Sequence, residues 1–386
     1  MTLEAQVRID YRVLGRAIAA QAAAPAAADV DRDARFPREA IDRLKQEGLL
    51  SAMIPVELGG MGATLTDMAA LTEELGMACS SAGMVFAMHQ IQVNCLIRHG
   101  RSAALEDFKR EVVRDQLLIA SATTEVGIGG DVRSSLCHVD IDGDTFRVIK
   151  QAPVISYGEQ ADILFLTARR APDSPANDQV LTVMRMADIE LERTGEWDTL
   201  GFRGTCSPGF VVRGRGPVDL ILDDSYADIS GRSMLPSAHI LWGHLWLGMA
   251  TYAVNQARAV VRNAARAKPG TMPPGVHRLA ELMVVHQQMT DLMRSAAARY
   301  EATYDDVDAQ TSISFAISMN SLKVSASTLL IDIVGRALVI VGIAGYREDS
   351  KYSLGRVLRD AWGAPLMVNN DRILGNTAQL LLVSKD

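Results

Sequence analysis

The stretch LLIASATTEVGIGGD, residues 117–131, marks the point at which the sequence changes from helical to strand-like patterning. Its first half is a short apolar run, and its second half is a loop with three glycines, which let the backbone approach a ligand closely. Further short apolar or alternating runs follow at residues 146–150, 162–170, 179–186, 209–214 and 218–224. The Asp-Gly pair in IDGDTF (141–146) is typical of a hairpin turn. Residues 119–229 are therefore predicted to form an all-β domain.

Helical patterning flanks this β domain on both sides. In the string FPREAIDRLKQEGLL (36–50), Ile41, Leu44 and Leu49 recur close to every 3.6 residues, which predicts an amphipathic helix. Three long stretches with helical periodicity come after the β domain, at residues 240–267, 277–307 and 313–342. The third is unusually apolar for a surface helix, so we expect it to lie inside a bundle or at an oligomer interface.

These blocks predict an α+β fold with three domains. We expect an N-terminal α-helical domain over residues 1–118, a middle β-barrel or β-sandwich domain over 119–229, and a C-terminal four-helix bundle over 230–386. A β domain between two helical domains creates clefts at the domain boundaries, where ligand sites often form.

The composition argues against several classes of partner. The chain has 386 residues, with 39 Lys and Arg against 46 Asp and Glu; the net charge of −7 argues against nucleic acid as a partner. No apolar run approaches the roughly 20 residues that span a bilayer, and the start lacks a secretory segment, so we expect no membrane partner. The four cysteines lack paired C-x-x-C spacing, which predicts no metal site and favours reduced thiols in the cytoplasm.

Four strings, in order along the chain, carry a resemblance to a known family: FPREAIDRLKQEGLLSAMIPVELGGMGATLTDMAALTEELG (36–76), SATTEVGIGGD (121–131), LGFRGTCSPGFVV (200–212) and GIAGYREDSKYSLGRVLRDA (342–361). They are similar to the opening helices with their Gly-Gly-x-Gly loop, the Leu-Thr-Glu-Pro-x-Ala-Gly-Ser-Asp segment, the Leu-Gly-x-Arg-Gly-Thr strand and the Gly-Gly-x-Gly-Tyr helix end of acyl-CoA dehydrogenases. The chain thus resembles the acyl-CoA dehydrogenase superfamily of flavoproteins over nearly its whole length.

The resemblance implies an FAD cofactor between the β domain and the C-terminal bundle, in a homo-oligomer (a tetramer or a dimer) that completes the site. At the flavin ring it implies contacts from Thr123, Thr124, Gly129 and Gly130 of the glycine loop. Ser156 stands where the family has a threonine that contacts the flavin, so a hydroxyl is kept. These residue types suit a flavin, because hydroxyl and backbone donors can pair with its polar edge.

The resemblance also implies FAD contacts farther from the ring. Gly342 and Gly345 match the family's loop beside the adenosine part of FAD. Arg278 stands near the place of the family's Arg-x-x-Phe-Gly string, which meets the FAD of the neighbouring subunit, although Leu279 and Ala280 replace its Phe-Gly.

The family's usual catalytic glutamate is absent. Acyl-CoA dehydrogenases remove a proton α to a thioester carbonyl, which requires a base close to the α carbon. Most members place a glutamate seven residues after an Arg-Asp-Ala string; counted from Ala361, that position holds Val368. Other members place it early in the helix after the β domain, where this chain has Ala238 and His239.

Three interpretations follow. In the leading one, the chain desaturates an acyl thioester, bound to CoA or to an acyl carrier protein, with a non-standard base. His239 is the first candidate for that base, because imidazole titrates near neutral pH, and Asp371 is the second. Both residue types also fit structural roles, His239 as a helix-start residue without chemistry and Asp371 as a helix cap.

In the second interpretation, the chain is a flavin-dependent monooxygenase on the same fold. Relatives of this kind use reduced flavin and O₂ to hydroxylate N, C or S centres, and they need no base for an α proton. Asn369, Asn370 and Asp371 would then lie near the flavin and orient a substrate or oxygen. In the third interpretation, the chain is a catalytically silent flavoprotein that supports an active partner through its apolar third helix.

The substrate cavity is expected between the N-terminal helices, the β domain and the first long C-terminal helix. Met84, Met88 and Met367 would give it adaptable apolar walls. Trp242 and Trp246, one helical turn apart, are interpreted first as core residues and second as part of that wall. No concentrated basic run marks a site for the phosphates of CoA, so a carrier-bound acyl group or a free small molecule stays open.

Overall fold

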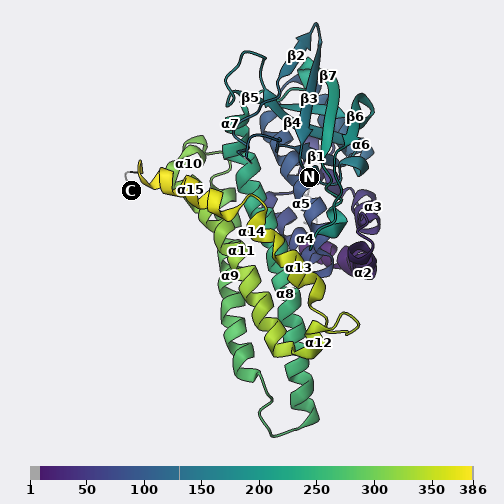
Figure 1. The fold of residues 1–386 in the computed structure, drawn as a ribbon, viewed down its shortest axis with the longest axis vertical. Coiled ribbons are helices and arrows are strands. Elements are labelled where there is room, and N and C mark those ends of the chain that lie inside the picture. Colours follow the sequence, from purple (N-terminus) through teal and green to yellow (C-terminus); the bar gives the residue numbers. More distant parts are fainter. Residues whose placement is uncertain (1–8, 130, 385–386) are drawn as a thin grey trace, which may run out of the picture.

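The computed structural model describes residues 9–129 and 131–384. A β domain lies at one end of the molecule, helices from the N-terminal third lie beside it, and three long helices extend away from it (Figure 1). This order of helices, strands and helices confirms the predicted α+β fold.

The N-terminal helices are α1 (Tyr11–Ile18), α2 (Ala24–Arg32), α3 (Arg38–Gln46), α4 (Leu65–Ala78), α5 (Ser80–His99) and α6 (Ala103–Asp115). Helix α4 begins with a reciprocal cap, in which Thr64 Oγ1 accepts from the backbone N of Asp67 (3.1 Å) and the backbone N of Thr64 donates to Asp67 Oδ2 (3.0 Å). The loop before it is tight at Gly60, where a β-carbon would lie 1.9 Å from the Ile54 carbonyl oxygen. Helix α5 is buried along almost its whole length and forms the centre of this group.

Two sheets make up the described β domain. Their strands are β1 (Ile119–Ala122), β2 (Val139–Asp142), β3 (Thr145–Ala152), β4 (Ile163–Arg169), β5 (Gln179–Arg185), β6 (Ile189–Arg193) and β7 (Phe210–Pro217). The first sheet has the order β1-β4-β5 with β1 parallel to β4, and the second has the antiparallel order β2-β3-β7-β6. Strands β2 and β3 form the predicted hairpin, with Gly143 at φ 61° in the turn.

One predicted strand, residues 218–224, is wrong. Val218–Leu220 forms a single 3₁₀ turn, and Ile221 contributes only an isolated bridge to Thr182. The chain leaves the sheet here because Pro217 ends β7 and the following residues turn toward the C-terminal helices.

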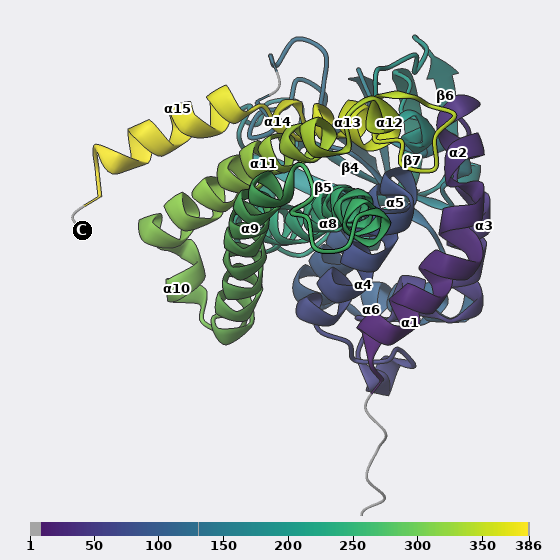
Figure 2. The ribbon, with the colours of Figure 1, turned by 90° about the horizontal axis from the view of Figure 1, so that it is seen from below.

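The C-terminal helices are α7 (Tyr226–Ile229), α8 (Leu235–Ala267), α9 (Val276–Ala302), α10 (Val307–Thr311), α11 (Ile313–Val341), α12 (Ile343–Tyr346), α13 (Gly355–Ala361), α14 (Gly363–Leu366) and α15 (Asn370–Leu381). The long helices α8, α9 and α11 pack together, which agrees with the predicted bundle. In place of a fourth long helix, the chain after α11 forms four short helices that contact α11, and α15 extends outward (Figure 2). Gly342, at φ 68°, starts this break by ending α11.

Helix α11 is long and apolar enough to cross a bilayer by length and composition, contrary to the expectation that no run reaches that length. Core helices of ordinary domains pass the same test, and α11 packs against α8 and α9. Only 39% of its most apolar 18 residues are buried, so one face of α11 is open in the single chain.

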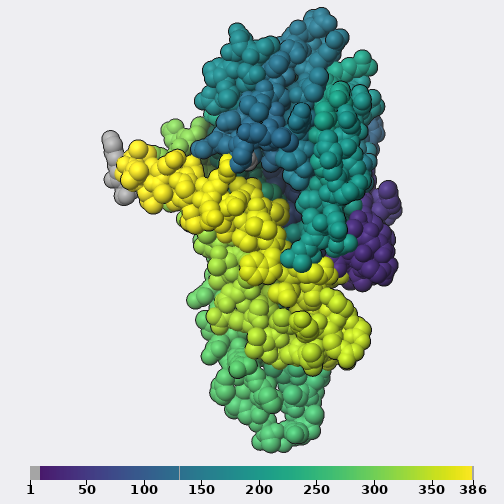
Figure 3. Space-filling view, viewed as in Figure 1, coloured from purple at the N-terminus to yellow at the C-terminus, as the bar shows by residue number. Residues whose placement is uncertain are grey.

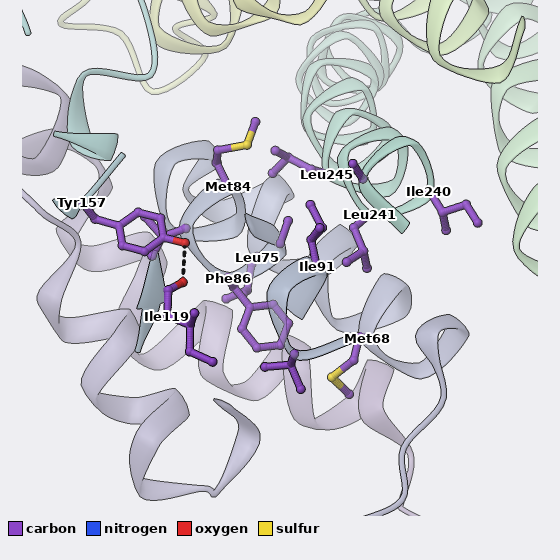
Figure 4. Packing of buried hydrophobic residues seen from close by; sticks show 14 of the residues in the cluster. Met68, Leu75, Met84, Phe86, Ile91, Ile119, Tyr157, Ile240, Leu241 and Leu245 are labelled. Carbon is purple, nitrogen blue, oxygen red and sulfur yellow. Dashed lines mark hydrogen bonds between the residues drawn. The ribbon is translucent and has the colours of Figure 1, made fainter. Parts of the chain in front are cut away.

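The hydrophobic core joins the three parts of the chain. Met84 and Ile91 of α5 and Leu241 of α8 belong to one buried cluster (Figure 4). In the same view Tyr157 donates its hydroxyl to the Ile119 carbonyl oxygen (3.0 Å), which ties the loop after β3 to β1. The core therefore fixes the β domain against the two helices, α5 and α8, that border the cavity described next.

Candidate active site

A cavity of about 1100 Å³ lies where the β domain, α5, α8 and residues 359–372 meet. Figure 3 shows the surface hollowed between the β domain and the C-terminal helices, drawn in yellow. The volume is large for a ligand pocket, so the cavity has room for part of a cofactor together with a substrate.

Hydroxyl groups of the β domain form the polar wall of this cavity. Ser121, Thr123 and Thr124 lie at and just after the end of β1, while Ser156 and Ser207 come from two other loops. Ser207 donates to Ser156 Oγ (2.8 Å), and Ser156 donates to no described residue. The hydroxyl hydrogen of Ser156 is therefore available to a ligand with acceptor atoms along one edge.

Buried charges hold the glycine loop that follows β1. Glu125 accepts from the backbone N of Cys137 (2.8 Å), and Lys150 Nζ lies 3.9 Å from the Glu125 carboxylate. Burial lowers the pKa of Lys150. From the other side, the Arg372 guanidinium donates to the carbonyl oxygen of Gly129, which lines the cavity. The loop is thus joined to both the β domain and α15.

The facing wall comes from the chain between α13 and α15. Arg359, Trp362, Met367, Asn369 and Asp371 line the cavity there. Met367 thus lies in the cavity wall where it was predicted, and Asn369 and Asp371 line the same cavity. Their roles beside a flavin stay predictions.

Two acidic residues anchor this wall to the rest of the protein. The buried carboxylate of Asp360 accepts from the backbone N of Phe202 (2.6 Å) and from the Ser80 hydroxyl, and burial raises its pKa. Asp31 pairs with the Arg359 guanidinium (Nη2 to Oδ2, 2.5 Å). The Arg-Asp pair of the family's Arg-Asp-Ala string therefore has a structural task in this chain.

Val368, which stands at the position of the missing glutamate, has an unusual backbone conformation as well as an apolar side chain. Val368 lines the cavity at φ 45°, a left-handed conformation that is strained for a β-branched residue. Beneath it, the fully buried Lys323 of α11 donates from Nζ to the Val368 carbonyl oxygen (2.9 Å) and to Asn370 Oδ1 (2.7 Å). Burial lowers the pKa of Lys323 to about 8. Sequence reasoning missed Lys323, for which the only signal was a lone lysine in a very apolar helix.

Acid–base groups are scarce along the cavity. Among the described residues that line it, Asp371 is the single carboxylate, and neither histidine nor cysteine occurs. Asp371 is exposed and lies in the first turn of α15, where its backbone N donates to Asn369 Oδ1 (2.7 Å).

The prediction that His239 is the catalytic base needs correction. Ala238 lines the cavity, but His239 faces α11, where its Nδ1 lies 2.9 Å from the Met319 carbonyl oxygen and its Nε2 is enclosed without a partner. Burial lowers the pKa of His239 to about 4. The imidazole therefore stays neutral inside the bundle and does not reach the cavity.

Other predicted FAD residues lie away from the cavity. Asn370 is turned toward α11, where Lys323 and Ser327 bind its side chain. Gly342 and Gly345 lie at the end of α11 and in α12, and Arg278 lies in the first turn of α9, at the end of the bundle remote from the β domain (Figure 1). Contacts from these residues to the distant part of FAD stay predictions. Gly130 lies outside the described residues.

Helices α5 and α8 form the remaining wall. Met84 and Met88 line it as predicted, together with Gln92, which sequence reasoning did not single out. Trp242 belongs to the wall, whereas Trp246 is fully buried in the core, so the two indoles that the sequence could not separate have different surroundings.

Comparison with known proteins agrees with this architecture. The family model for the N-terminal domain of acyl-CoA dehydrogenases matches residues 10–115, and the model for the C-terminal domain matches residues 233–367. The chain belongs to the acyl-CoA dehydrogenase superfamily, whose members are flavin-dependent oxidoreductases.

Two curated relatives illustrate the sequence similarity. A cyclohex-1-ene-1-carbonyl-CoA dehydrogenase of Syntrophus aciditrophicus is 30% identical over 49% of this chain and 46% of its own length. A probable acyl-CoA dehydrogenase of Mycobacterium leprae, fadE25, is 25% identical over 91% of this chain and 89% of its own. The first match spans about half of each protein, and the second spans nearly all.

Two solved structures show how closely the fold is shared. FMN-bound TdsC from Paenibacillus sp. A11-2 has a TM-score of 0.84 at 18% identity, covering 96% of this chain and 97% of TdsC. Butyryl-CoA dehydrogenase from Megasphaera elsdenii has a TM-score of 0.81 at 19% identity, covering 99% and 100%. At these identities the likeness establishes the fold alone.

Proposed function

We propose that this chain is a flavin-dependent oxidoreductase that holds FAD with its ring in the cavity described above. The hydroxyls of Thr123, Thr124 and Ser156 suit the acceptor-rich edge of the ring, and Trp362 and Met367 supply apolar surface opposite. When bound, flavin supplies two-electron oxidation of a substrate or, once reduced, activation of O₂. The protein supplies the donors, the apolar walls and the exclusion of bulk water.

Of the two reactions open to such a site, its acid–base chemistry favours oxygen-dependent hydroxylation. The observation that carries this choice is Val368, an apolar side chain at the place of the family's usual glutamate, with its carbonyl oxygen bound by Lys323. A valine cannot accept an α proton, whereas hydroxylation needs none to be removed. The solved structures of similar fold include one described as dibenzothiophene monooxygenase as well as butyryl-CoA dehydrogenase, so the fold accommodates either reaction.

Desaturation of an acyl thioester is the second candidate, with Asp371 as the base and CoA or an acyl carrier protein as the carrier. Asp371 favours it by being a carboxylate on the cavity wall. The two curated relatives, named cyclohex-1-ene-1-carbonyl-CoA dehydrogenase and probable acyl-CoA dehydrogenase, support it as well. Arg372 on the same wall would receive the anionic part of such a substrate.

Oxygen dependence separates these two reactions. Flavin-loaded protein is mixed with butyryl-CoA, and with the corresponding acyl carrier protein thioester, in the absence of O₂. Hydroxylation predicts no loss of flavin absorbance, and product only after a small aromatic or thioester substrate is supplied with reductant and air. Anaerobic bleaching would instead establish desaturation, and Asp371→Asn should then abolish it. A protein that retains neither FAD nor FMN would leave only the silent-partner interpretation.

We also propose that the chain forms a homodimer or homotetramer. Large apolar side chains are exposed on three C-terminal helices: Val339 on α11, Ile343 and Tyr346 on α12, and Leu374 and Leu381 on α15. Exposed apolar side chains on these helices are expected at a subunit interface. A second copy would cover the open face of α11 and bring further residues toward FAD.

A further inference from the structure

One end of the C-terminal bundle carries exposed basic side chains that have no acidic partner. The hairpin between α8 and α9 lies at the end of the bundle remote from the β domain (Figure 1). Residues 229–280, which include this hairpin, contain no aspartate or glutamate. Four exposed cations, called the basic tip from here on, form no ion pair in the described chain: Arg262, Arg266, Lys268 and Arg278. Their charges can therefore attract an acidic surface from outside the chain.

Acidic residues near the basic tip do not cancel its charge. The carboxylates of Glu281 and Asp332 both act on the guanidinium of Arg336, and Asp332 pairs with it (Oδ1 to Nε, 2.7 Å). In the loop after α12, Asp349 pairs with Arg347 (2.5 Å). These carboxylates already have basic neighbours of their own, so the tip keeps an excess of positive charge.

The opposite end of α9 carries the opposite charge. Residues 301–308, which lead from the end of α9 into α10, contain no lysine or arginine. Their four carboxylates, called the acidic loop from here on, form no ion pair with any residue that the structure describes: Glu301, Asp305, Asp306 and Asp308. Glu301 accepts from the backbone N of Thr66 (2.9 Å), and Asp306 accepts from the backbone N of Ala309 (2.9 Å). Asp305 and Asp308 are exposed and accept no hydrogen bond within the described ranges.

The basic tip and the acidic loop of one chain lie too far apart to neutralise each other. Helix α9 separates them and has 27 residues, which corresponds to about 40 Å. Charges interact weakly beyond a Debye length of about 8 Å at physiological ionic strength. Two copies placed antiparallel about a two-fold axis bring the tip of each copy to the loop of the other, and the symmetry makes both contacts at once.

The open face of α11 lies between these two charged regions. Helix α11 begins at Ile313, soon after the acidic loop, and ends at Val341 beside the hairpin, where a β-carbon on Gly275 would lie 3.6 Å from Ile340. An antiparallel partner that pairs the charges would therefore also cover this face. The charged regions are thus continuous with the apolar surface that already indicates self-association.

We propose that two copies of this chain associate antiparallel along their C-terminal bundles, with the basic tip of each copy against the acidic loop of the other. This inference rests on the proposed self-association and adds which charged surfaces meet. The exposed apolar side chains contribute affinity, whereas complementary charges fix the relative orientation of the copies and speed their encounter.

Reversal of charge tests this pairing. Two double variants are made, Arg262→Glu with Arg266→Glu in the basic tip, and Asp305→Lys with Asp308→Lys in the acidic loop. Sedimentation velocity gives the dissociation constant for self-association at about 50 mM NaCl, where surface charges are only partly screened. Each variant alone should associate at least about tenfold more weakly than wild type, because like charges then meet at both symmetric contacts.

Mixing the two variants is the decisive step. In a mixed pair the reversed tip of one chain faces the reversed loop of the other, and the native loop faces the native tip. The mixture should therefore associate within about threefold of wild type, since every contact is again attractive. Recovery on mixing also shows that neither variant is misfolded. The control is Arg38→Glu, an exposed arginine of α3 without an ion pair among the described residues, and it should associate as wild type does.

The inference is overturned if either double variant self-associates as strongly as wild type, if the mixture stays dissociated, or if the control is weakened equally. A wild type that assembles but does not respond to charge reversal would leave the proposed self-association standing without this pairing. A monomeric wild type would contradict both. Flavin binding, recorded by absorbance on the same samples, tests the proposed redox function separately.

Discussion

Lys323 is a buried cation whose hydrogen-bond partners are neutral groups. It lies against the strained loop at Val368 and helps to hold that loop in place. Its ammonium binds the Val368 carbonyl oxygen and the Asn370 side chain, which are the residues on either side of Asn369 at the cavity. A left-handed valine costs on the order of 1–3 kcal/mol, so the loop needs such support from below. Lys323 therefore acts on the cavity as a positioning residue.

Replacement of Lys323 by Met should change how stability responds to alkaline pH. The native pKa of Lys323 is about 8, below the unfolded value of about 10.4, so the unfolded chain binds more protons between these values. The free energy of unfolding of wild type should therefore rise relative to Lys323→Met between pH 8 and 10.4, by up to about 3 kcal/mol. Urea unfolding at pH 7.5 and 10 measures this. Parallel pH profiles of the two proteins would contradict the burial of a charged lysine here.

His239 is expected to act through stability at acid pH and not through turnover. Its native pKa of about 4 lies below the unfolded value of 6.5, so the unfolded state alone gains a proton as the pH falls from 6.5 to 4. Stability is lost in that window, by up to about 3 kcal/mol, and His239→Gln should lack this loss. His89, whose pKa burial also lowers to about 4, gives a comparison variant. Strong loss of turnover per folded His239→Gln molecule would restore His239 as a catalytic base.

Some cavity residues could be predicted from the sequence, whereas the placement of others depends on how a helix is rotated. Thr123, Thr124 and Ser156 were found from strings that adjoin a strand, and the structure brings all three to one wall. The side on which His239 and Gln92 lie depends on helix rotation, which the apolar sequence around them does not settle. Both helices are apolar on nearly all faces, so hydrophobic periodicity does not show which face points toward the cavity.

Among the elements, the irregular segment at residues 194–202 depends on anchors distant in sequence. Phe202 donates its backbone N–H to Asp360 of α13, and Leu200 accepts from the Arg359 guanidinium (3.2 Å). Trp197 and Thr199 of this segment line the cavity. The segment can therefore form a wall without regular secondary structure of its own.

Asp360→Ala should destabilise the protein and weaken flavin binding together. The change leaves the Phe202 N–H and the Ser80 hydroxyl buried without their acceptor, at a cost of about 2–3 kcal/mol. Thermal unfolding and flavin titration measure the two effects. Glu348→Ala, which removes an exposed carboxylate 4.0 Å from Arg359, is the control and should change little. Equal stability of Asp360→Ala and wild type would refute this anchor.

Helices could be located from the sequence where the helical periodicity extended over many residues. The predicted helices at 240–267 and 313–342 correspond to α8 and α11, and the Asp-Gly hairpin formed as expected. Strand β6 (Ile189–Arg193), which the sequence did not indicate, is rich in charge because only one of its edges is paired and its side chains are largely exposed. The short helices after Gly342 likewise depend on packing against α11. A local sequence pattern carries no information about such packing.

At the scale of the whole molecule, the open face of α11 predicts self-association. A double variant, Val339→Glu with Ile343→Glu, places charge on two side chains that are 61% and 72% exposed in the single chain. Sedimentation velocity should show wild type as a dimer or tetramer and the variant shifted toward monomer, because buried unpaired charge is costly at an interface. Val56→Glu, equally exposed but on the N-terminal helical domain, should keep the wild-type assembly. A monomeric wild type would contradict the prediction.

We propose that one cavity, bounded by the hydroxyl wall of the β domain and the C-terminal helices, receives the flavin ring. A crystal structure of the flavin-loaded protein tests it most directly. We expect electron density for the tricyclic ring beside Thr123, Thr124 and Ser156, with Trp362 and Met367 opposite. Flavin density elsewhere, or a cavity closed by the protein's own side chains in flavin-soaked crystals, would contradict it.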